Sequence, residues 1–435
     1  MSMLHPEFEK LSQTEVRRLQ DNLWCRQWEY VRKHSSFYKK KLGATADNRE
    51  IFLDNLQDLP FTDKDELRIS QEQDYPYGDY AACDPALVAR VQITSGTTGK
   101  PLILANTKDD LSWIARVGGR AFYASGLRPG DRVVHCLNYC MWTGGLTDHL
   151  NLESAGASVV PFGVGNVDKL LDTILDLKIT AISCTPSYPA LLEQRLAERG
   201  MAPKELGLKL ALFGGEPGLD DPNFRSALEQ TWGFAVRNAN YGMSEVMSIL
   251  ASQTATSNDL CFHASDAVFA ELVDGNGAPV PIVEGNTGEL VCTHLRKECQ
   301  PLIRYRTRDL VTVTRSEASE SGRTSWRFRV VGRTDDMFNV RGINVFPGSI
   351  QKTIREHASV VTGEFRIQLA GQGPWDFIEL KVEAAKDLPD SQWPEAGRTL
   401  EQAIKKDTGA SARVTLIPAD TLPRTAGKTQ LIERI

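Results

Sequence analysis

The spacing of apolar and polar residues divides the chain into stretches with different periodicities. In the first 90 or so residues, charged side chains are interleaved with a set of apolar ones at helical spacing: Leu19, Leu23, Trp28, Tyr30 and Val31. This pattern predicts an amphipathic helix, because every third or fourth residue of a helix returns to the same face. Turn-forming residues around Pro60, Pro76 and Gly78 then predict an irregular segment.

From about residue 130 onward, short apolar runs alternate with stretches of helical periodicity. The runs that read as strands span 133–137, 157–162, 181–184 and 210–213. The helix-like stretches include 169–177 and 188–199. Buried strands that alternate with helices predict an α/β fold built on a layered sheet.

The pattern becomes richer in strands between about residues 260 and 334, and the last hundred residues have the pattern of a separate small α+β unit. The first of these regions is expected to contain strands near 271–273, 289–291 and 310–313 and a hairpin or exposed loop over 315–324. The small unit is expected to contain helices near 349–357 and 400–405 and strands near 365–367, 378–382 and 414–417. In the second of these strands, apolar and charged residues alternate: Ile378, Leu380 and Val382 against Glu379, Lys381 and Glu383. This alternation predicts a sheet with one face in water.

The composition narrows the functional classes. The 435 residues include 50 Lys and Arg against 56 Asp and Glu, a formal net charge of −6. A mildly acidic chain without a basic block is a poor candidate for binding nucleic acid or an anionic membrane surface, so small molecules are the expected partners. The first residues lack the pattern of a signal peptide, and no apolar run is long enough to span a bilayer. The 8 cysteines are scattered without a CxxC pair, which fits reduced thiols in a cytoplasmic protein.

The strongest local signal follows the apolar-rich run 87–93. It is an octad of small, hydroxyl-bearing and basic residues: Thr94, Ser95, Gly96, Thr97, Thr98, Gly99, Lys100 and Pro101. Glycines let the backbone approach a polyanion, hydroxyls donate hydrogen bonds to phosphate oxygens, and successive backbone N–H groups form an anion-binding nest. Pro101 excludes a Walker A loop, which requires Ser or Thr after the lysine, and so disfavours a P-loop kinase or ATPase. The structural alternative is an ordinary solvated loop.

This octad resembles the phosphate loop of the adenylate-forming superfamily, which includes acyl-CoA synthetases, the adenylation domains of peptide synthetases, and luciferases. The chain is most similar to the phenylacetate-CoA ligase branch, and further matching segments run in order along nearly the whole chain: 58–68, 142–145, 185–188, 213–217 and 304–309. Each segment alone is a weak signal, whereas their order and spacing together are specific. The resemblance implies a large N-terminal adenylation domain over residues 1–334, a small mobile C-terminal α+β domain over 335–435, and a homodimer.

The resemblance also assigns residues to the nucleotide. One motif matches the family's aromatic-Gly-x-Ser/Thr-Glu pattern: Asn240, Tyr241, Gly242, Met243, Ser244 and Glu245. An aromatic ring can stack on adenine, a hydroxyl can reach phosphate, and the Glu245 carboxylate can hold Mg²⁺. The remaining residues implied in nucleotide binding are Gly215, Glu216, Pro217 and, for the ribose hydroxyls, Asp309. The alternative for Asp309 is an Arg-Asp ion pair that holds a turn.

Three further residues are implied in catalysis or domain movement. Asp335 matches the pivot of the family's interdomain hinge, which must absorb a large backbone change, and Arg333 is expected near the nucleotide. Lys428 lies in a segment that looks like the family's catalytic-lysine loop. Its ammonium group can offset the negative charge that builds as a carboxylate attacks the α-phosphate. Taken alone, these residues would be a polar turn and a solubilising surface lysine.

By the same resemblance, the acyl pocket is lined by Tyr139, Trp142, Thr143, Gly144, Phe213, Gly214 and Ala239. An apolar wall with glycine at points of close approach suits a flat aromatic acid such as phenylacetate, benzoate or an amino- or hydroxybenzoate. The chain departs from the branch at Gln92, which stands near the place where a histidine often precedes the phosphate loop. A small aliphatic or hydroxy acid is the alternative substrate.

Some relatives in this branch carry a structural zinc site. Three residues lie near its positions here, Cys261, His263 and Cys299, and thiolate and imidazole ligands suit Zn²⁺. The earlier cysteine of that site is absent, because residues 251–253 read Ala-Ser-Gln. We therefore favour buried thiols over zinc.

These assignments predict an ATP-dependent carboxylate-CoA ligase with two half-reactions. The acid attacks the α-phosphorus of ATP·Mg²⁺ to form an acyl-adenylate and diphosphate, and the thiol of coenzyme A then attacks the acyl carbon and releases AMP. The C-terminal domain swings about Asp335 between the two steps. One alternative is a stand-alone adenylating enzyme that loads an acyl-carrier protein. Another is a nucleotide-binding sensor that no longer catalyses, which the intact Lys428, Glu245 and Asp309 argue against.

Overall fold

The computed structural model describes residues 2–47, 51–94, 101–216, 218–316, 322–423 and 431–435. Residue contacts divide the chain into two compact units. The first comprises Met1–Thr307 and Val311–Arg329, and the second comprises Arg308–Leu310 and Val330–Ile435. The domain boundary expected between residues 334 and 335 stays a prediction.

Helices form the N-terminal part of the first unit. They are α1 (Pro6–Glu9), α2 (Gln13–His34), α3 (Ser36–Leu42) and α4 (Lys64–Gln73), and short 3-10 helices span Gly43–Asp47, Leu53–Asp58, Pro85–Leu87 and Pro203–Leu206. α2 begins at a capping box in which the side chains of Ser12 and Glu15 accept hydrogen bonds from each other's backbone N–H groups. On its buried face, Trp28 packs in one cluster with Leu295 and Ile303 from far along the chain. The amphipathic helix predicted here is confirmed.

A 12-stranded sheet runs through the first unit in the order β11-β10-β12-β13-β14-β9-β8-β7-β6-β5-β3-β4. Its strands are β3 (Arg132–His135), β4 (Ser158–Pro161), β5 (Ala181–Cys184), β6 (Leu210–Gly214), β7 (Ala235–Met243), β8 (Met247–Thr254), β9 (Ser257–Phe262), β10 (Val268–Val273), β11 (Pro279–Val280), β12 (Thr287–His294), β13 (Tyr305–Arg315) and β14 (Arg327–Arg333). The strands β4, β3, β5, β6 and β7 pair in parallel, whereas β7 with β8 and β8 with β9 are antiparallel. The strands predicted in this region are confirmed. Of the expected loop at 315–324, residues 317–321 lie outside the described residues.

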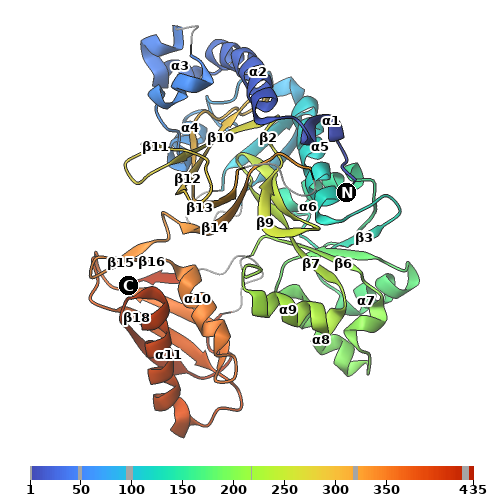
Figure 1. The fold of residues 1–435 in the computed structure, drawn as a ribbon, viewed down its shortest axis with the longest axis vertical. Helices are drawn as coiled ribbons and strands as arrows, with labels where there is room; N and C mark the ends of the chain where they lie inside the picture. Colours follow the sequence, from blue (N-terminus) through green and yellow to red (C-terminus); the bar gives the residue numbers. More distant parts are fainter. Residues whose placement is uncertain (1, 48–50, 95–100, 217, 317–321, 424–430) are drawn as a thin grey trace. The chain divides into compact units, whose positions relative to one another are not determined.

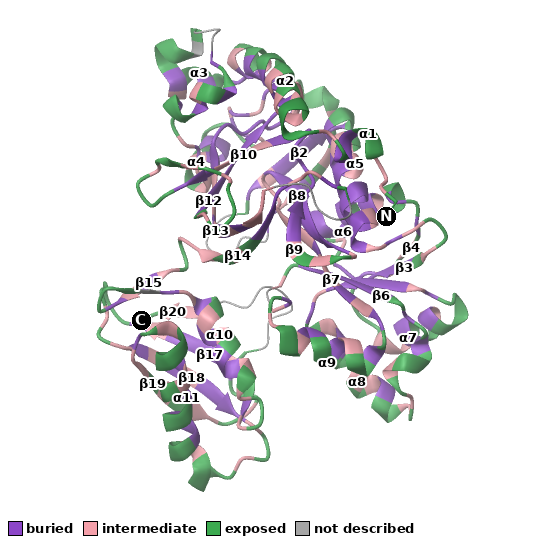
Figure 2. Cartoon of the chain, in the orientation of Figure 1, coloured by how far each residue is buried: buried purple, intermediate pink, exposed green. Residues whose placement is uncertain are grey.

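Helices cover both faces of the parallel part of the sheet. They are α5 (Lys108–Ser125), α6 (Thr143–Ser154), α7 (Val167–Asp176), α8 (Tyr188–Glu198) and α9 (Pro222–Trp232). α7, α8 and α9 share one buried core with the sheet, which includes Trp232 and Phe213, whereas α5 and α6 share another, which includes Phe122 and Leu212. Neighbouring residues of a strand point to opposite faces, so Leu212 and Phe213 of β6 enter different cores. Because both faces are covered, the inner strands β3, β5 and β6 read as largely apolar runs and are mostly buried (Figure 2). The predicted α/β architecture is confirmed.

The second unit is a small α+β structure. Its four-stranded sheet has the order β19-β18-β17-β20. The elements of the unit are β15 (Phe338–Val340), β16 (Ile343–Val345), α10 (Pro347–Glu356), β17 (Val361–Leu369), β18 (Ile378–Ala384), a 3-10 helix (Asp390–Gln392), α11 (Trp393–Thr408), β19 (Ala412–Ile417) and β20 (Ile432–Arg434). The helices and strands predicted for this region are confirmed. The edge strand β20 was not predicted, because three residues are too few to show a periodicity.

One expectation for this unit was wrong. Glu383 was expected to face water with Glu379 and Lys381, but its side chain is fully buried. Its carboxylate accepts a hydrogen bond from the Thr362 hydroxyl at 3.0 Å and another from the backbone N–H of Leu422 at 2.7 Å. The sequence alternation at 378–383 could not reveal this, because the second donor belongs to a segment almost forty residues away.

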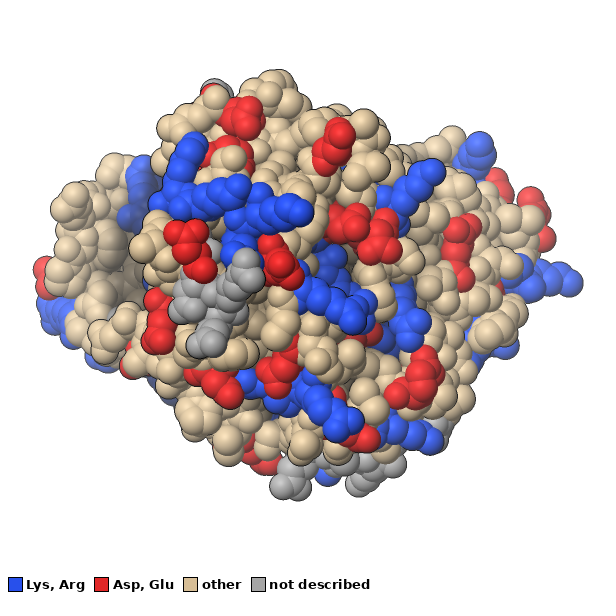
Figure 3. Space-filling view, turned by 90° about the horizontal axis from the view of Figure 1, so that it is seen from above, with Lys and Arg blue, Asp and Glu red and all other residues tan. Residues whose placement is uncertain are grey.

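The surface agrees with the modest net charge. On the face shown in Figure 3, Lys and Arg side chains are interleaved with Asp and Glu side chains. None of the helices within the described ranges combines the length and the hydropathy required to cross a membrane.

Candidate active site

The two ends of the phosphate-loop octad meet at the base of a β-hairpin. Residues 95–100, which include Ser95, Gly96, Thr97, Thr98, Gly99 and Lys100, lie outside the described residues. The flanking strands β1 (Val88–Ile93) and β2 (Ile103–Thr107) pair antiparallel. Thr94 is buried, and it exchanges hydrogen bonds with Leu102: its N–H donates to the Leu102 carbonyl, and its Oγ1 accepts from the Leu102 N–H, both at 3.0 Å. The octad therefore emerges from a rigid base.

This base is tied to the Trp142-Thr143-Gly144-Gly145 segment. The Ile93 N–H donates to the Met141 carbonyl at 2.9 Å, and Ile93 forms a parallel bridge with Trp142. Gln92 reinforces the link, because its Nε2 donates to the Trp142 carbonyl at 3.2 Å and its Oε1 accepts from the Thr147 hydroxyl at 3.0 Å. Two segments that are fifty residues apart are thus joined at one place.

The carboxyl ends of the parallel strands bring the other motifs together. Gly214, at the end of β6, pairs with Asn240 of β7. The Glu216 carboxylate accepts a hydrogen bond from the backbone N–H of Ser187, in the segment that follows β5, at 3.2 Å. Pro217 lies outside the described residues. Ligands of parallel sheets bind outside the carboxyl ends of the strands, so this edge is the expected place for a nucleotide.

The motif at 240–245 lies at a hairpin. Asn240 to Met243 are the last residues of β7, and Ser244 and Glu245 lie in the turn before β8. Gly242 is a point of close approach, because a Cβ atom there would lie 2.3 Å from the Ser248 carbonyl oxygen. The Tyr241 ring lies edge-on to Phe328, with 5.2 Å between the ring centroids.

Glu245 forms an ion pair that the sequence did not predict. The Glu245 side chain is only 7% exposed, and its Oε1 lies 2.6 Å from the Nζ of Lys64. Lys64 is the first residue of α4, whose N-cap Asp63 accepts from the N–H groups of Asp65 and Glu66. In the sequence, the only indication that Lys64 lies at the site is its position in the matching segment 58–68. The resemblance assigned no role to this lysine.

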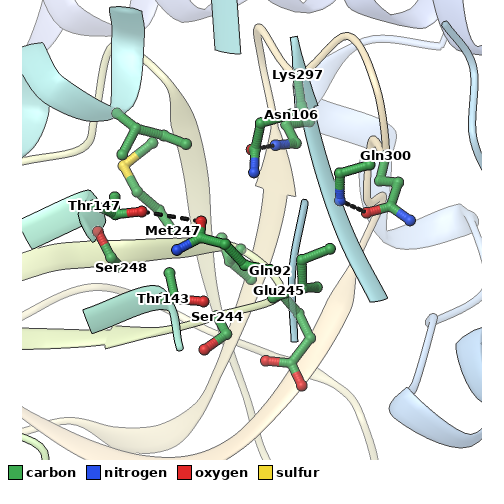
Figure 4. A pocket seen from close by; sticks show the side chains of 14 residues that line it. Gln92, Asn106, Thr143, Thr147, Ser244, Glu245, Met247, Ser248, Lys297 and Gln300 are labelled. Atoms are coloured by element: carbon green, nitrogen blue, oxygen red, sulfur yellow. Dashed lines mark hydrogen bonds between the residues drawn. The ribbon is translucent and has the colours of Figure 1, made fainter. Parts of the chain in front are cut away.

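The residues expected to line the acyl pocket are divided among different environments. Thr143 lines a pocket together with Gln92, Thr147 and Ser244, shown in Figure 4. The Trp142 ring covers Gly144, where a Cβ atom would lie 2.7 Å from the ring. The Tyr139 hydroxyl hydrogen-bonds His149 Nδ1 at 2.9 Å. Phe213 and Ala239 are fully buried in the cores on opposite faces of the sheet, so their side chains do not meet.

His135 is a buried residue that orients the glycines of this segment. Its Nε2 lies 3.2 Å from the Gly144 carbonyl and 2.9 Å from the Gly145 carbonyl, and its Nδ1 lies 3.0 Å from Ser183 Oγ. Burial lowers the pKa of His135 to about 4, and burial lowers the pKa of His294 to about 4 as well. A neutral imidazole can donate from Nε2 to the carbonyls and accept at Nδ1 from the Ser183 hydroxyl. The only signal in the sequence was a polar residue inside an apolar run.

We expect the free energy of unfolding to fall as the pH is lowered from about 6.5 to about 4. In this range the unfolded histidines bind protons, with an ordinary pKa of about 6.5, whereas the folded His135 and His294 stay neutral until about pH 4. The difference between the unfolded and the folded pKa corresponds to a loss of about 3 kcal/mol in the free energy of unfolding for each histidine at the acid end of this range. Denaturant unfolding as a function of pH should show a shallower decline for His135→Gln than for the wild type. Identical slopes would contradict the assignment.

In the second unit, one arginine joins the expected ribose-binding and hinge residues. The Nη1 of Arg333 donates to Asp309 Oδ1 at 2.7 Å. Its Nε and Nη2 donate to the two carboxylate oxygens of Asp335 at 2.9 and 2.8 Å. Both the Arg-Asp pair considered for Asp309 and a bidentate contact to the hinge residue are therefore present. Gly332 is required beside them, because a Cβ atom there would lie 2.5 Å from the Phe346 ring.

Lys428 lies outside the described residues, but the residues on both sides of 424–430 are anchored. Before this segment, the buried Glu383 accepts from the Leu422 N–H, and the Nη2 of the buried Arg366 donates to the Pro423 carbonyl at 3.2 Å. After it, Ile432 of β20 pairs in parallel with Ile367 of β17. Both ends are thus attached to the same sheet.

The three zinc candidates are not brought together. His263 Nε2 hydrogen-bonds the Ser252 hydroxyl at 3.0 Å, and burial lowers its pKa well below the ordinary value. Cys261 and Cys299 are buried free thiols, and Cys299 hydrogen-bonds Cys83. Within the part of the chain that the structure describes, no group of three or more His, Cys, Asp or Glu side chains is placed to hold a metal ion. Cys261 and Cys299 are thus both buried thiols, the interpretation favoured from the sequence.

Comparisons with known proteins agree with the resemblance identified from the sequence. A family model described as AMP-binding enzyme matches residues 33–294, and one described as AMP-binding enzyme C-terminal domain matches residues 342–433. A phenylacetate-coenzyme A ligase of Thermus thermophilus is 35% identical over 446 residues, which cover 98% of this chain and 97% of the relative. One from Pseudomonas putida is 34% identical over 391 residues, which cover 89% and 86%.

A similar solved structure is that of 2-hydroxyisobutyryl-CoA ligase in the postadenylation state in complex with 2-HIB-AMP. It is 26% identical, the match covers 99% of this chain and 92% of that chain, and the TM-score is 0.88. The same enzyme with 2-HIB-AMP and CoA in the thioesterification state is 28% identical over 99% and 91% of the chains, with a TM-score of 0.71. The resemblance to the phenylacetate-CoA ligase branch is thereby confirmed, and the chain belongs to the AMP-binding enzyme family.

Proposed function

We propose that the protein is an ATP-dependent carboxylic acid-CoA ligase that forms an acyl-adenylate and releases diphosphate and then AMP. One observation carries this proposal: the base of the octad, the Trp142-Thr143 segment and the ends of β6 and β7 converge at one edge of the sheet. The relatives named as phenylacetate-coenzyme A ligases support it, because they match nearly the whole chain and most of their own length. Aromatic acids are accordingly the first candidates for the substrate.

In the first half-reaction, the acid's carboxylate attacks the α-phosphorus of ATP and diphosphate leaves. The octad holds the phosphates, Tyr241 stacks on adenine, and Asp309 accepts hydrogen bonds from the ribose hydroxyls. Lys428 offsets the negative charge that develops at the α-phosphate, where a preorganised positive charge has its largest effect.

Glu245 suits the role of magnesium ligand. Mg²⁺ prefers carboxylate oxygens, and the Glu245 carboxylate is held at the turn of the β7-β8 hairpin. Its present counter-ion, Lys64, has a side chain that is 38% exposed and can move aside. A bound Mg²⁺ would supply charge neutralisation of the triphosphate, whereas Glu245 supplies the fixed anionic group that orients it.

In the second half-reaction, the thiol of coenzyme A attacks the acyl carbon and AMP leaves. We assign Asp335 as the pivot of the C-terminal domain between the two steps. The bidentate contact from Arg333 to Asp335 supports this assignment, because a change of backbone at the pivot would alter this contact.

The direct test is to incubate the protein with ATP, Mg²⁺ and a panel of aryl and short aliphatic acids, with and without coenzyme A. We expect acid-dependent formation of diphosphate and AMP, and formation of an acyl-CoA when coenzyme A is present. Products would be separated by chromatography. Release of ADP with phosphate, or no acid-dependent exchange of diphosphate into ATP, would contradict the proposal. A thioester formed only on an added carrier protein would retain the adenylation step and change the acceptor.

A further inference from the structure

A buried aspartate on α6 joins the two strands of the hairpin that carries Tyr241 and Glu245. The side chain of Asp148 is fully buried. Its Oδ2 accepts a hydrogen bond from the side-chain amide of Asn240, near the end of β7. Another hydrogen-bond partner is the hydroxyl of Ser248, the second residue of β8. One carboxyl group therefore bridges the two strands, with one contact on each side of the turn.

This bridge lies where the matching segments of the first unit meet. Asn240 pairs with Gly214 at an irregularity in the register of β6 and β7. The two residues are in close contact, because a Cβ atom on Gly214 would lie 2.6 Å from the Asn240 Cβ. The helix that carries Asp148 begins at Thr143, in the segment attached to the base of the octad. Asp148 thus connects α6 to the place where the ends of β6 and β7 are held together.

No cation compensates a charge on Asp148 among the described residues. Burial raises the pKa of Asp148 well above its ordinary value, and the hydrogen bonds from Ser248 and Asn240 offset this only in part. Of the elements around it, β4 and β8 carry no titratable side chain, and Lys108 and Asp109 of α5 are exposed. The other titratable side chains on α5, α6 and β7 have partners elsewhere: Arg116 pairs with Glu7, Arg120 with Asp266, Asp110 with Lys297 and His149 with Glu153, Tyr123 lies under Arg128, Tyr241 lies edge-on to Phe328, and Arg237 donates to the Val236 and Ala255 carbonyls.

The fully buried side chain of Asn151 gives an independent indication that Asp148 is uncharged. The Asn151 amide is satisfied on both sides when its oxygen accepts from the Ser248 hydroxyl at 3.3 Å and its nitrogen donates to the carbonyls of Thr147 and Ile114, at 3.2 and 3.3 Å. This arrangement uses the single proton of the Ser248 hydroxyl. The hydrogen bond between Ser248 and Asp148 then requires a proton on the carboxyl group.

We propose that Asp148 is a positioning residue for the adenylation step, which holds Tyr241 and Glu245 in place through its bridge between Asn240 and Ser248. This inference rests on the ligase function proposed above, because the roles of Tyr241 and Glu245 come from there. An amide fits the bridge as well as a carboxylic acid does, since it can accept from Asn240 and donate to Ser248. A leucine side chain of similar size can do neither.

The functional test compares Asp148→Asn with Asp148→Leu in acid-dependent diphosphate exchange. We expect the KM for ATP to rise about tenfold in the leucine variant, the effect of leaving buried polar groups unpaired beside the nucleotide motif, and to stay within about twofold of the wild type in the asparagine variant. Ser248→Ala removes one end of the bridge and should raise the same KM by a smaller factor. A general loss of folded protein would lower kcat without changing this KM.

Folding stability provides a readout that does not depend on activity. Above about pH 4 the unfolded Asp148 is ionised, whereas the folded Asp148 keeps its proton because its pKa is raised. The wild type therefore takes up a proton on folding, and its free energy of unfolding falls as the pH rises, whereas Asp148→Asn needs no proton. We expect the ratio of the wild-type to the Asp148→Asn unfolding equilibrium constant to rise at least about tenfold between pH 4 and pH 7, measured by denaturant unfolding.

A matched control is Asp172→Asn. Asp172 also lies on a helix of the first unit, but it is exposed and pairs with Arg199. Its replacement should leave the KM for ATP unchanged and should show no such rise in the ratio of unfolding constants. A ratio for Asp148→Asn that does not change with pH would overturn the proposal and leave the ligase function intact. An unchanged KM for ATP in both Asp148→Leu and Ser248→Ala would do the same. A wild type that releases no AMP with any acid would instead overturn the proposed function.

Discussion

Replacing Lys428 with alanine should lower the rate of acyl-adenylate formation by about 100- to 1000-fold and lower thioester formation from a preformed adenylate far less. Removing one charged or hydrogen-bonding group that stabilises the transition state of a displacement has an effect of about this size. In the proposed mechanism the Lys428 ammonium acts only while the carboxylate attacks the α-phosphorus. The first rate would be measured as acid-dependent diphosphate exchange, and the second with chemically prepared acyl-AMP and coenzyme A.

A matched control for this prediction is Lys406→Ala. Lys406 is an exposed lysine in the last turn of α11, in the same unit. Its loss should change neither half-reaction. If Lys428→Ala lowered both half-reactions equally, the lysine would be acting on the fold or on a shared binding step, and the assignment to adenylation would be rejected.

Replacing Glu245 with glutamine should lower acid-dependent diphosphate exchange by about 100-fold or more, because it removes a fixed anion from a nearly buried site. Two consequences are combined in this variant. The magnesium ligand is weakened, because a neutral amide oxygen binds a divalent cation less strongly than a carboxylate, and Lys64 loses its counter-ion. We therefore expect the Mg²⁺ concentration needed for half-maximal exchange to rise together with the loss of rate.

The control for Glu245 is the exposed Glu284, whose replacement by glutamine should leave exchange and its Mg²⁺ dependence unchanged. Lys64→Met separates the two consequences, because it removes the counter-ion and keeps the carboxylate. A Glu245→Gln enzyme with the wild-type rate and the wild-type Mg²⁺ requirement would remove the residue from the proposed mechanism.

The elements of the fold could be predicted where burial produces a local pattern. The parallel strands β3, β5 and β6 lie between two layers of helices, so each reads as a largely apolar run. β20 and the burial of Glu383 could not be predicted in this way. The first depends on pairing with β17, and the second depends on a backbone N–H supplied by Leu422. Both are long-range interactions that a local pattern does not record.

The candidate site shows the same division. The order of the motifs along the chain predicted which segments meet, and the family assignment is confirmed. The chemistry of the pocket wall could not be read from that order, because Gln92, Thr143 and Ser248 come from three different elements. Phe213 and Ala239 were assigned to one pocket, although the two-residue repeat of the strands places their side chains on opposite faces. The structure gives the positions of these side chains, and the catalytic and binding roles assigned to the site residues stay predictions.

The buried carboxylate of Glu383 has a practical consequence for how the C-terminal lysine can be studied. An enzyme shortened to end at Pro418 would lack the lysine, but it would also lose the Leu422 N–H and the whole of β20. The shortened chain would remove a backbone donor from a buried anion and expose the edge of β17, which could recruit other chains into aggregates. A deletion would therefore confound lost chemistry with lost solubility, whereas a single side-chain replacement separates them.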